Sequence, residues 1–166
     1  MPEQVPSIDT YLLGQTPAAI RRLRAMGQLH NPQTQRMFEE AGITTGMKVL
    51  DVGCGPGEVS LIAAELVGEA GSVLGVDASA AAVEAAQARV QAAGVTNASF
   101  MVGDLLKLEL DQDFDAIVGR FILMHLAEPT AVLRRLTSYL RPGGVVAFQE
   151  YDLSSHEDAF YPPSPV

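Results

Sequence analysis

Residues 48–57 read KVLDVGCGPG, and this stretch decides the fold. The apolar run at its start predicts a short buried strand at 48–52. The strand leads into a loop with glycines at 53, 55 and 57, and a helix is expected from Glu58 to about Val67. Because glycine has no side chain, a ligand can approach the loop backbone, where the helix N-terminus offers free N–H groups. The stretch therefore predicts a strand, a ligand-binding loop and a helix in direct succession.

The same alternation of strand and helix continues along the chain. Further strands are expected at 73–76, 99–102, 114–118 and 145–148. A helix capped by Ser79 is predicted to reach Ala93. Another is predicted from Pro129 to Leu140, where Pro142-Gly143-Gly144 breaks it. Strands separated by helices predict an α/β fold, in which right-handed crossovers connect a parallel sheet covered on both faces.

The chain divides into a helical arm or lid at 1–41, a ligand-binding domain at 42–152 and a C-terminal tail at 153–166. Within the arm we predict two helices, at 16–29 and 32–41. Pro17 and Pro32 suit the first turn of each helix, because the N–H that proline lacks would be unpaired there anyway. The tail is expected to be poorly ordered or truncated.

Composition narrows the class of protein. With 166 residues, 48% of them hydrophobic and 19% charged, the chain suits one compact domain and is unlike a disordered segment. Its single cysteine, Cys54, cannot form an internal disulfide, which agrees with a reducing compartment. The sequence holds neither an apolar run of membrane-spanning length nor a signal-peptide pattern, so we expect a cytoplasmic protein without membrane contact. The net charge of −9 offers no general attraction for nucleic acid, and we expect no such partner.

Acidic residues follow the next two predicted strands. Asp77 ends the strand after the glycine loop, and Asp104 ends the one after that. Carboxyl ends of parallel strands share one edge of the sheet, so both carboxylates are expected beside the loop. Asp77 can accept hydrogen bonds from two vicinal hydroxyls such as those of a ribose, and Asp104 can accept one from an exocyclic amine. Glu58 stands where a dinucleotide-binding loop has its third glycine, which favours a ligand without phosphates.

Together these motifs resemble those of class I S-adenosylmethionine-dependent methyltransferases. The likeness covers about residues 42–152 and rests on the glycine motif at 49–57, GVD at 75–77, GDL at 103–105, FDAIV at 114–118 and LRPGG at 140–144. It implies a Rossmann-like, doubly wound parallel sheet with the strand order 3-2-1-4-5. In that family strands 6 and 7 follow, and the residues after 149 show no pattern for them. Strand five would then be an exposed edge that can pair with another chain, so we expect either a truncated chain or a homo-oligomer that covers this edge.

The resemblance also implies a set of cofactor-binding positions. They comprise the glycine loop, the acidic strand ends with their neighbours, the backbone after the fourth strand and a tyrosine in the arm: Tyr11, Asp51, Gly53, Gly55, Gly57, Asp77, Ala78, Asp104, Leu105, Gly119 and Arg120. Asp51 can instead support the loop by accepting backbone hydrogen bonds, and Tyr11 can instead anchor the arm. The reaction compels no particular catalytic residue. His125 is the best-placed titratable group after the fourth strand, although a packing role is open to it as well.

We therefore expect methyl transfer from S-adenosylmethionine to a small-molecule acceptor, with S-adenosylhomocysteine as product. The sequence at 119–122, GRFI, differs from the Asn- or Asp-Pro-Pro-aromatic motif typical of enzymes that methylate planar amines. It also lacks the acidic ligands of metal-dependent members, so no metal is predicted. One alternative is a non-catalytic module that holds the cofactor or its demethylated product and acts through a partner chain. Another is a nicotinamide-dependent oxidoreductase.

Overall fold

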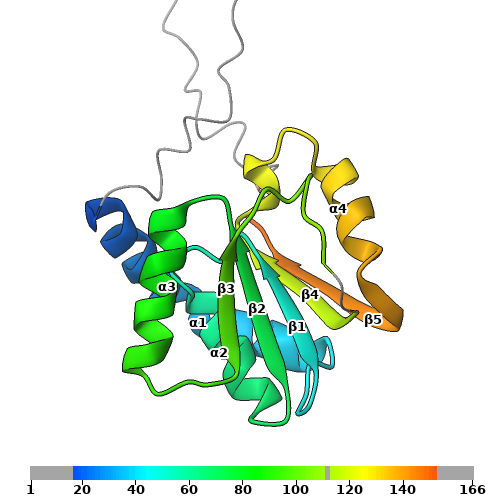
Figure 1. The fold of residues 1–166 in the computed structure, drawn as a ribbon, viewed down its shortest axis with the longest axis horizontal. Helices are drawn as coiled ribbons and strands as arrows, with labels where there is room; N and C mark the ends of the chain where they lie inside the picture. Colours follow the sequence, from blue (N-terminus) through cyan, green and yellow to red (C-terminus); the bar gives the residue numbers. More distant parts are fainter. Residues whose placement is uncertain (1–16, 111–112, 153–166) are drawn as a thin grey trace, which may run out of the picture.

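A five-stranded parallel sheet forms the centre of the computed structural model, which describes residues 17–110 and 113–152 (Figure 1). The strand order is β3-β2-β1-β4-β5, and every neighbouring pair is parallel. The strands are β1 (Lys48–Val52), β2 (Ser72–Asp77), β3 (Ala98–Val102), β4 (Phe114–Arg120) and β5 (Leu140–Gln149). The predicted Rossmann-like fold class and strand order are confirmed.

Helices cover both faces of this sheet. They are α1 (Pro17–Glu40), α2 (Glu58–Val67), α3 (Ala80–Ala92) and α4 (Pro129–Thr137), with a short 3-10 helix, η2, at Leu123–His125. Successive residues of β1 point to opposite faces, so Val49 packs in one buried cluster and Leu50 in the other. This explains why the strand is apolar on both sides.

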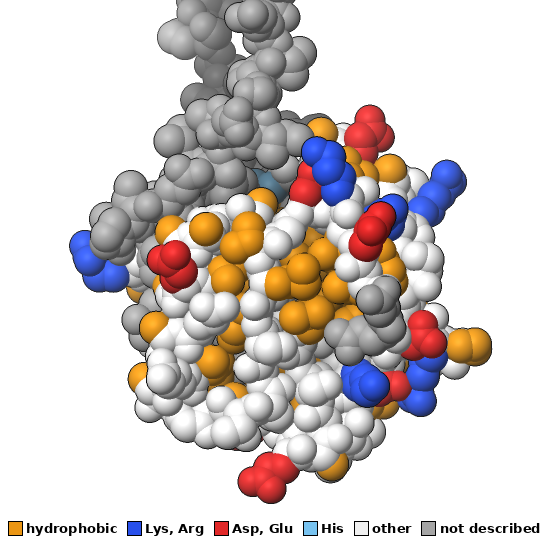
Figure 2. Space-filling model, viewed as in Figure 1, with side chains coloured by type: hydrophobic (Ala, Val, Ile, Leu, Met, Phe, Trp, Pro, Cys, Tyr) orange, Lys and Arg blue, Asp and Glu red, His pale blue; other side chains and the backbone are white. Residues whose placement is uncertain are grey.

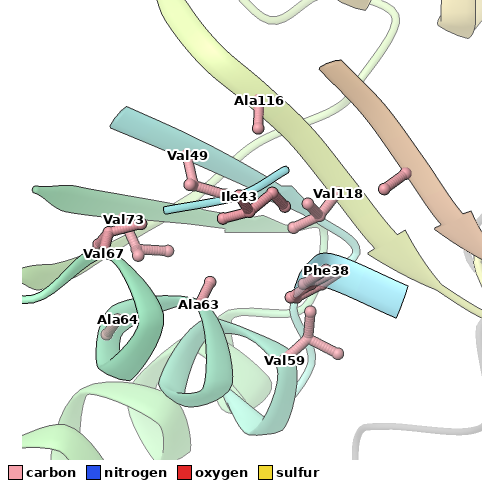
Figure 3. Close-up of a cluster of buried hydrophobic side chains, with 11 residues drawn as sticks. Phe38, Ile43, Val49, Val59, Ala63, Ala64, Val67, Val73, Ala116 and Val118 are labelled. Atoms are coloured by element: carbon pink, nitrogen blue, oxygen red, sulfur yellow. The ribbon is translucent and has the colours of Figure 1, made fainter. Parts of the chain in front are cut away.

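The first buried cluster lies between the sheet and helices α1 and α2. Phe38 and Val59 bring the two helices together beneath Val118 of β4 (Figure 3). The second cluster lies on the opposite face, where Leu136 of α4 and Leu108, from the segment between β3 and β4, pack on the sheet. Figure 2 shows apolar side chains at the surface on this second face, between α3 and α4. The two faces therefore differ in how fully helices cover them.

Helix α1 differs from the prediction of two helices in the arm. It is one continuous helix, with Pro32 in its interior. Proline removes one backbone hydrogen bond from a helix interior. Gly27, Thr34 and Phe38 are buried along one side of α1, however, and this packing holds the helix together across the proline. The predicted break was wrong because tertiary contacts outweigh a local helix breaker.

Strand β5 begins earlier than predicted. Helix α4 ends at Thr137, and β5 pairs with β4 from Leu140 onward. Between the pairs Phe114–Leu140 and Ala116–Val145 the register shifts. The segment 141–144 therefore forms a bulge, with Gly143 at φ 81°. Pro142-Gly143-Gly144 thus interrupts strand pairing, whereas the sequence predicted that it ends a helix.

In the part of the chain that the structure describes, β5 pairs with β4 alone, and the sheet has no sixth or seventh strand. The outer edge of β5 is therefore unpaired there. Self-association through this edge stays a prediction. Among the same residues, no helix is long and apolar enough to cross a membrane.

Candidate functional site

The glycine loop lies at the carboxyl edge of the sheet, between β1 and α2. Gly53 N and Cys54 N donate to the carbonyl oxygen of Val76, over 2.8 and 3.1 Å, and tie the loop to β2. Gly53 and Gly55 both have positive φ, at 67° and 51°. A Cβ on Gly53 would lie 2.5 Å from Cδ1 of Ile122, whereas a Cβ on Gly55 would have no atom within 4 Å. Gly53 is thus required by packing, while Gly55 borders open space.

Asp77 ends β2 directly beside this loop. Its Oδ2 accepts a hydrogen bond from Gly55 N at 2.9 Å, and its Oδ1 accepts one from Ser79 N at 2.8 Å. The side chain is only 8% exposed. Burial raises the pKa of Asp77 above its ordinary value, and the two backbone hydrogen bonds act in the opposite direction. The carboxylate therefore holds the loop in place and retains lone pairs for a further donor. Ala78, next in the chain, is exposed.

Asp51 lies beneath the loop and is 0% exposed. Its Oδ2 accepts a hydrogen bond from the Ser60 hydroxyl of α2 at 2.5 Å, and its Oδ1 has no partner among the described residues. Burial raises the pKa of Asp51 to about 7, against the lowering effect of the Ser60 bond and the Arg120 charge. Asp51 thus joins β1 to α2 and does not reach the loop surface in this conformation.

Asp104 follows β3 at the same edge of the sheet and is exposed. Its Oδ1 accepts a hydrogen bond from Leu106 N at 2.9 Å, and its Oδ2 lies 3.5 Å from Lys107 Nζ. Leu105 is buried in the second core cluster. Gly103 N donates to the carbonyl oxygen of Asp77, which links the two acidic strand ends. The glycine loop, Asp77 and Asp104 consequently occupy adjacent strand ends, as the sequence predicted.

A polar network that the sequence did not reveal lies between the loop and α1. Glu58, at the start of α2, forms an ion pair with Arg89 of α3 and accepts a hydrogen bond from Asn31 Nδ2 at 3.3 Å. Asn31 Oδ1 accepts in turn from Arg120 Nη1 at 3.0 Å. The charge of Glu58 is therefore balanced inside the protein. This weakens the argument that Glu58 repels phosphates.

Arg120, at the end of β4, connects this network to the sheet. Its Nη1 donates to Thr34 Oγ1 at 2.9 Å, and the Thr34 hydroxyl lies 2.5 Å from Gln149 Oε1 of β5. Burial lowers the pKa of Arg120, while the carboxylates of Asp51 and Glu58 oppose that effect. The guanidinium is thus directed toward α1, and the Arg120 side chain anchors that helix. No local sequence signal indicates this, because each partner comes from a different element.

The segment after β4 is held by Glu150. Its Oε1 accepts hydrogen bonds from Ile122 N at 2.9 Å and Leu123 N at 2.8 Å, at the start of η2. His125 is exposed at the end of η2. Gly119 is buried, and a Cβ there would lie 2.6 Å from the Phe148 ring. The strand end is therefore closely packed, with His125 on its rim.

Two further site predictions concern Tyr11 and metals. Tyr11 lies outside the described residues. Within 17–110 and 113–152, no group of three or more His, Cys, Asp and Glu side chains could hold a metal ion.

Comparisons with known proteins add to this geometry. Residues 43–161 match the family described as a methyltransferase domain. The demethylmenaquinone methyltransferase of Staphylococcus aureus (strain MRSA252) is 30% identical over 122 residues, which are 73% of this chain and 50% of that protein. Aklanonic acid methyltransferase DauC of Streptomyces sp. (strain C5) is 31% identical over 137 residues, 82% of this chain and 62% of that protein.

The fold is likewise similar to solved structures. The crystal structure of a SAM-dependent methyltransferase from Aquifex aeolicus has a TM-score of 0.76 and 28% identity, and the match covers 82% of this chain and 73% of that one. By contrast, the chain spans only 50% and 62% of the length of the two curated relatives.

Proposed function

The chain belongs to the methyltransferase-domain family, and from that premise we propose that it binds S-adenosylmethionine and transfers the methyl group to a small-molecule acceptor. One observation carries the proposal. Three adjacent strand ends offer a glycine loop with open space at Gly55, a nearly buried carboxylate at Asp77 and an exposed one at Asp104. This arrangement suits a ligand with a charged amino-acid part, a ribose and an adenine.

The residues present fit such a cofactor. Gly55 would leave the backbone accessible to the methionine part, because a Cβ there would have no atom within 4 Å. Gly53 and Gly57 would contribute backbone to the same loop, and their missing side chains let it pack closely against Ile122 and α3. The ribose hydroxyls would donate to Asp77, whose two oxygens each hold one backbone N–H and keep lone pairs free.

The adenine and the amino group would meet the remaining positions. Asp104 would accept from the adenine amine beside the Leu105 N–H, with Ala78 next to the ribose. Carbonyl groups near Gly119 and Arg120 would accept from the methionine amino group. Asp51 would position the loop through Ser60, and Tyr11 would reach the cofactor carboxylate from the arm.

When bound, the sulfonium supplies both the methyl group and its leaving group. The chain then has to orient the acceptor, exclude water and, for some acceptors, remove a proton. For an acceptor that must lose a proton, His125 on the rim after β4 is the candidate base, although the reaction itself compels no particular residue. Two relatives are named for small molecules, demethylmenaquinone and aklanonic acid, which supports a small-molecule acceptor here.

A second candidate function is a non-catalytic cofactor-binding module. The unpaired outer edge of β5 in the described part of the chain favours it, because such an edge can pair with a partner chain. This module would bind S-adenosylmethionine or S-adenosylhomocysteine at the same strand ends and would transfer no methyl group.

Calorimetry with S-adenosylmethionine, S-adenosylhomocysteine and NAD tests the cofactor assignment. We expect the first two ligands to bind and NAD to leave no measurable heat. Binding of NAD alone would contradict the assignment and favour an oxidoreductase.

Transfer of a radiolabelled methyl group to a panel of metabolites then separates the enzyme from the module. The panel is tested with this chain and with the longest protein that its gene encodes. Transfer by either form supports the enzyme, whereas cofactor binding without transfer in both supports the module.

A further inference from the structure

Three rings from different elements meet beyond the ends of β4 and β5. Phe121 follows β4, Tyr151 follows β5 and His30 comes from α1. The Phe121 and Tyr151 rings stack with their centroids 4.2 Å apart and their planes 2° from parallel. His30 packs edge-on against both rings, at 5.0 Å from Phe121 and 5.8 Å from Tyr151. We call these three residues the aromatic cluster.

The backbone of Phe121 departs from what a bulky residue prefers. Its φ is 55°, and it is the only residue other than glycine with a positive φ in the described part of the chain. The left-handed region is unfavourable for a large side chain, and such outliers concentrate at functional sites. Phe121 N donates to the carbonyl oxygen of Gln149 at 2.8 Å, which holds the turn against β5. In this backbone conformation the Phe121 ring lies parallel to the Tyr151 ring.

The aromatic cluster adjoins the glycine loop. Ile122, next to Phe121, packs against Gly53 so closely that a Cβ on this glycine would lie 2.5 Å from Cδ1 of Ile122. Glu150, next to Tyr151, accepts hydrogen bonds from Ile122 N and Leu123 N. The Glu150 side chain therefore holds the turn after β4 next to the end of β5, close to the glycine loop. The aromatic cluster therefore lies beside the glycine-loop end of the cofactor site proposed above.

Tyr151 presents both an apolar and a polar surface. Its side chain is 45% exposed although Phe121 stacks on the ring, so part of the ring is accessible. Its hydroxyl lies 3.0 Å from Nε2 of His30. If the hydroxyl donates to His30, its oxygen can still accept a hydrogen bond from a ligand. A planar ring with a hydroxyl substituent matches this combination, because it can stack and donate at once.

We propose that the aromatic cluster is the acceptor subsite and that it takes a planar, hydroxylated aromatic ring. The ring stacks against Tyr151, and its hydroxyl donates to the Tyr151 phenolic oxygen. This inference rests on the proposed function, because an acceptor subsite needs a bound methyl donor beside it.

The experiment compares a planar aromatic alcohol with its saturated, non-planar counterpart. Dissociation constants for 2-naphthol and decahydro-2-naphthol are measured by ligand-observed NMR on the full chain, with and without saturating S-adenosylhomocysteine. We expect 2-naphthol to bind about three- to tenfold more tightly, the advantage typical of aromatic pairing. Tyr151→Leu should abolish this preference. Tyr151→Phe should weaken the binding of both alcohols and still keep a preference for 2-naphthol, because it retains the ring and loses only the hydroxyl.

An equal affinity for the two alcohols, or a preference that survives Tyr151→Leu, would overturn the proposal. Circular dichroism confirms that each variant is folded. Calorimetry with S-adenosylhomocysteine on the same samples separates the two proposals. If the cofactor binds and the alcohols are not distinguished, only the aromatic subsite is wrong. If the unmodified chain does not bind the cofactor, the proposed function fails, and the subsite loses its acceptor role even if the preference is present.

Discussion

Asp51 and Asp77 show how neighbouring carboxylates of one site take different roles. Asp51 is enclosed between β1 and α2 and has one hydrogen-bond donor, Ser60. Asp77 borders the loop and holds two backbone N–H groups. Burial raises the pKa of both carboxyl groups, more clearly for Asp51, which reaches about 7. We therefore expect Asp51 to affect the stability of the fold and Asp77 to affect ligand binding.

Replacing Asp51 should change how stability depends on pH. A carboxyl group whose pKa is about 7 when folded and 3.8 when unfolded binds more protons in the folded state between these values. Its contribution thus lowers the free energy of unfolding as pH rises from about 4 to 7, by about 4 kcal/mol at most. In Asp51→Asn this decline should be absent, so the variant gains stability relative to the wild type as pH rises.

Urea unfolding between pH 5 and 8 measures this difference. Unfolding is followed by circular dichroism, because the chain has no tryptophan for fluorescence. Ser60→Ala is the companion variant, because it removes the hydroxyl that donates to Asp51 and should extend the decline to higher pH. Parallel pH profiles for wild type and Asp51→Asn would contradict the assignment.

Replacing Asp77 should weaken cofactor binding. Asp77→Ala removes the proposed ribose acceptor and also the acceptor for Gly55 N. Loss of a hydrogen bond to a charged group costs about 1.5–3 kcal/mol, so the dissociation constant for S-adenosylhomocysteine should rise about ten- to a hundredfold. Calorimetry measures this change, with exposed Asp113→Ala as the matched control. Unchanged affinity in Asp77→Ala would mean that the ribose is held elsewhere.

At the scale of elements, different glycines of the loop between β1 and α2 serve packing and ligand binding. Gly53 and Gly55 share the left-handed backbone, but only Gly53 faces a side chain at close range. Both alanine variants are strained by about 1 kcal/mol, and Gly53→Ala must displace Ile122 as well.

We expect Gly53→Ala to lower the melting temperature more than Gly55→Ala does. Gly55→Ala should instead weaken S-adenosylmethionine binding while keeping most of the stability, because its Cβ enters the open space where the ligand is proposed to lie. Thermal unfolding and calorimetry on the pair measure both effects. Equal cofactor affinity in wild type and Gly55→Ala would place the ligand away from this glycine.

Beside Asn31, a buried hydroxyl on Thr34 also attaches helix α1 to the site. Thr34 is 0% exposed and contacts Arg120 Nη1 and Gln149 Oε1. Thr34→Val keeps the shape of the side chain but leaves both partners without that hydrogen bond, which should cost about 1–3 kcal/mol. Thr34→Ser, which keeps the hydroxyl, should lose clearly less. Urea unfolding compares the two, and similar losses would show that the methyl group and not the hydroxyl holds the helix.

At the scale of the whole molecule, the sheet has two edges in the described part of the chain, β3 and β5. Val146 on β5 and Val102 on β3 are 44% and 51% exposed. An apolar strand at an edge offers unpaired backbone groups to another chain, and a lysine blocks such pairing. We predict self-association through β5.

Sedimentation equilibrium should show concentration-dependent association that Val146→Lys weakens at least tenfold. Val102→Lys on the opposite edge is the matched control and should leave the association constant unchanged. A chain that stays monomeric at all concentrations, or that associates equally well in both variants, would exclude β5 as the interface.

The sequence by itself determined the order of strands and helices, the glycine loop and the carboxylates at successive strand ends. These depend on apolar periodicity and on glycine or proline breaks, which are local properties of the chain. The resemblance added the strand order. The loop lies beside Asp77 because parallel strands bring their carboxyl ends to one edge.

Only the tertiary structure decided the continuous helix through Pro32, the bulge in β5 and the network around Arg120. Arg120 and Thr34 are 86 residues apart, and Arg89 and Glu58 are 31 apart. Local preference for a helix or strand amounts to about 1 kcal/mol or less for most residues, so burial of one helix face can override it. Side-chain partners so distant in sequence meet only once the sheet has assembled, and for that reason no motif predicts them.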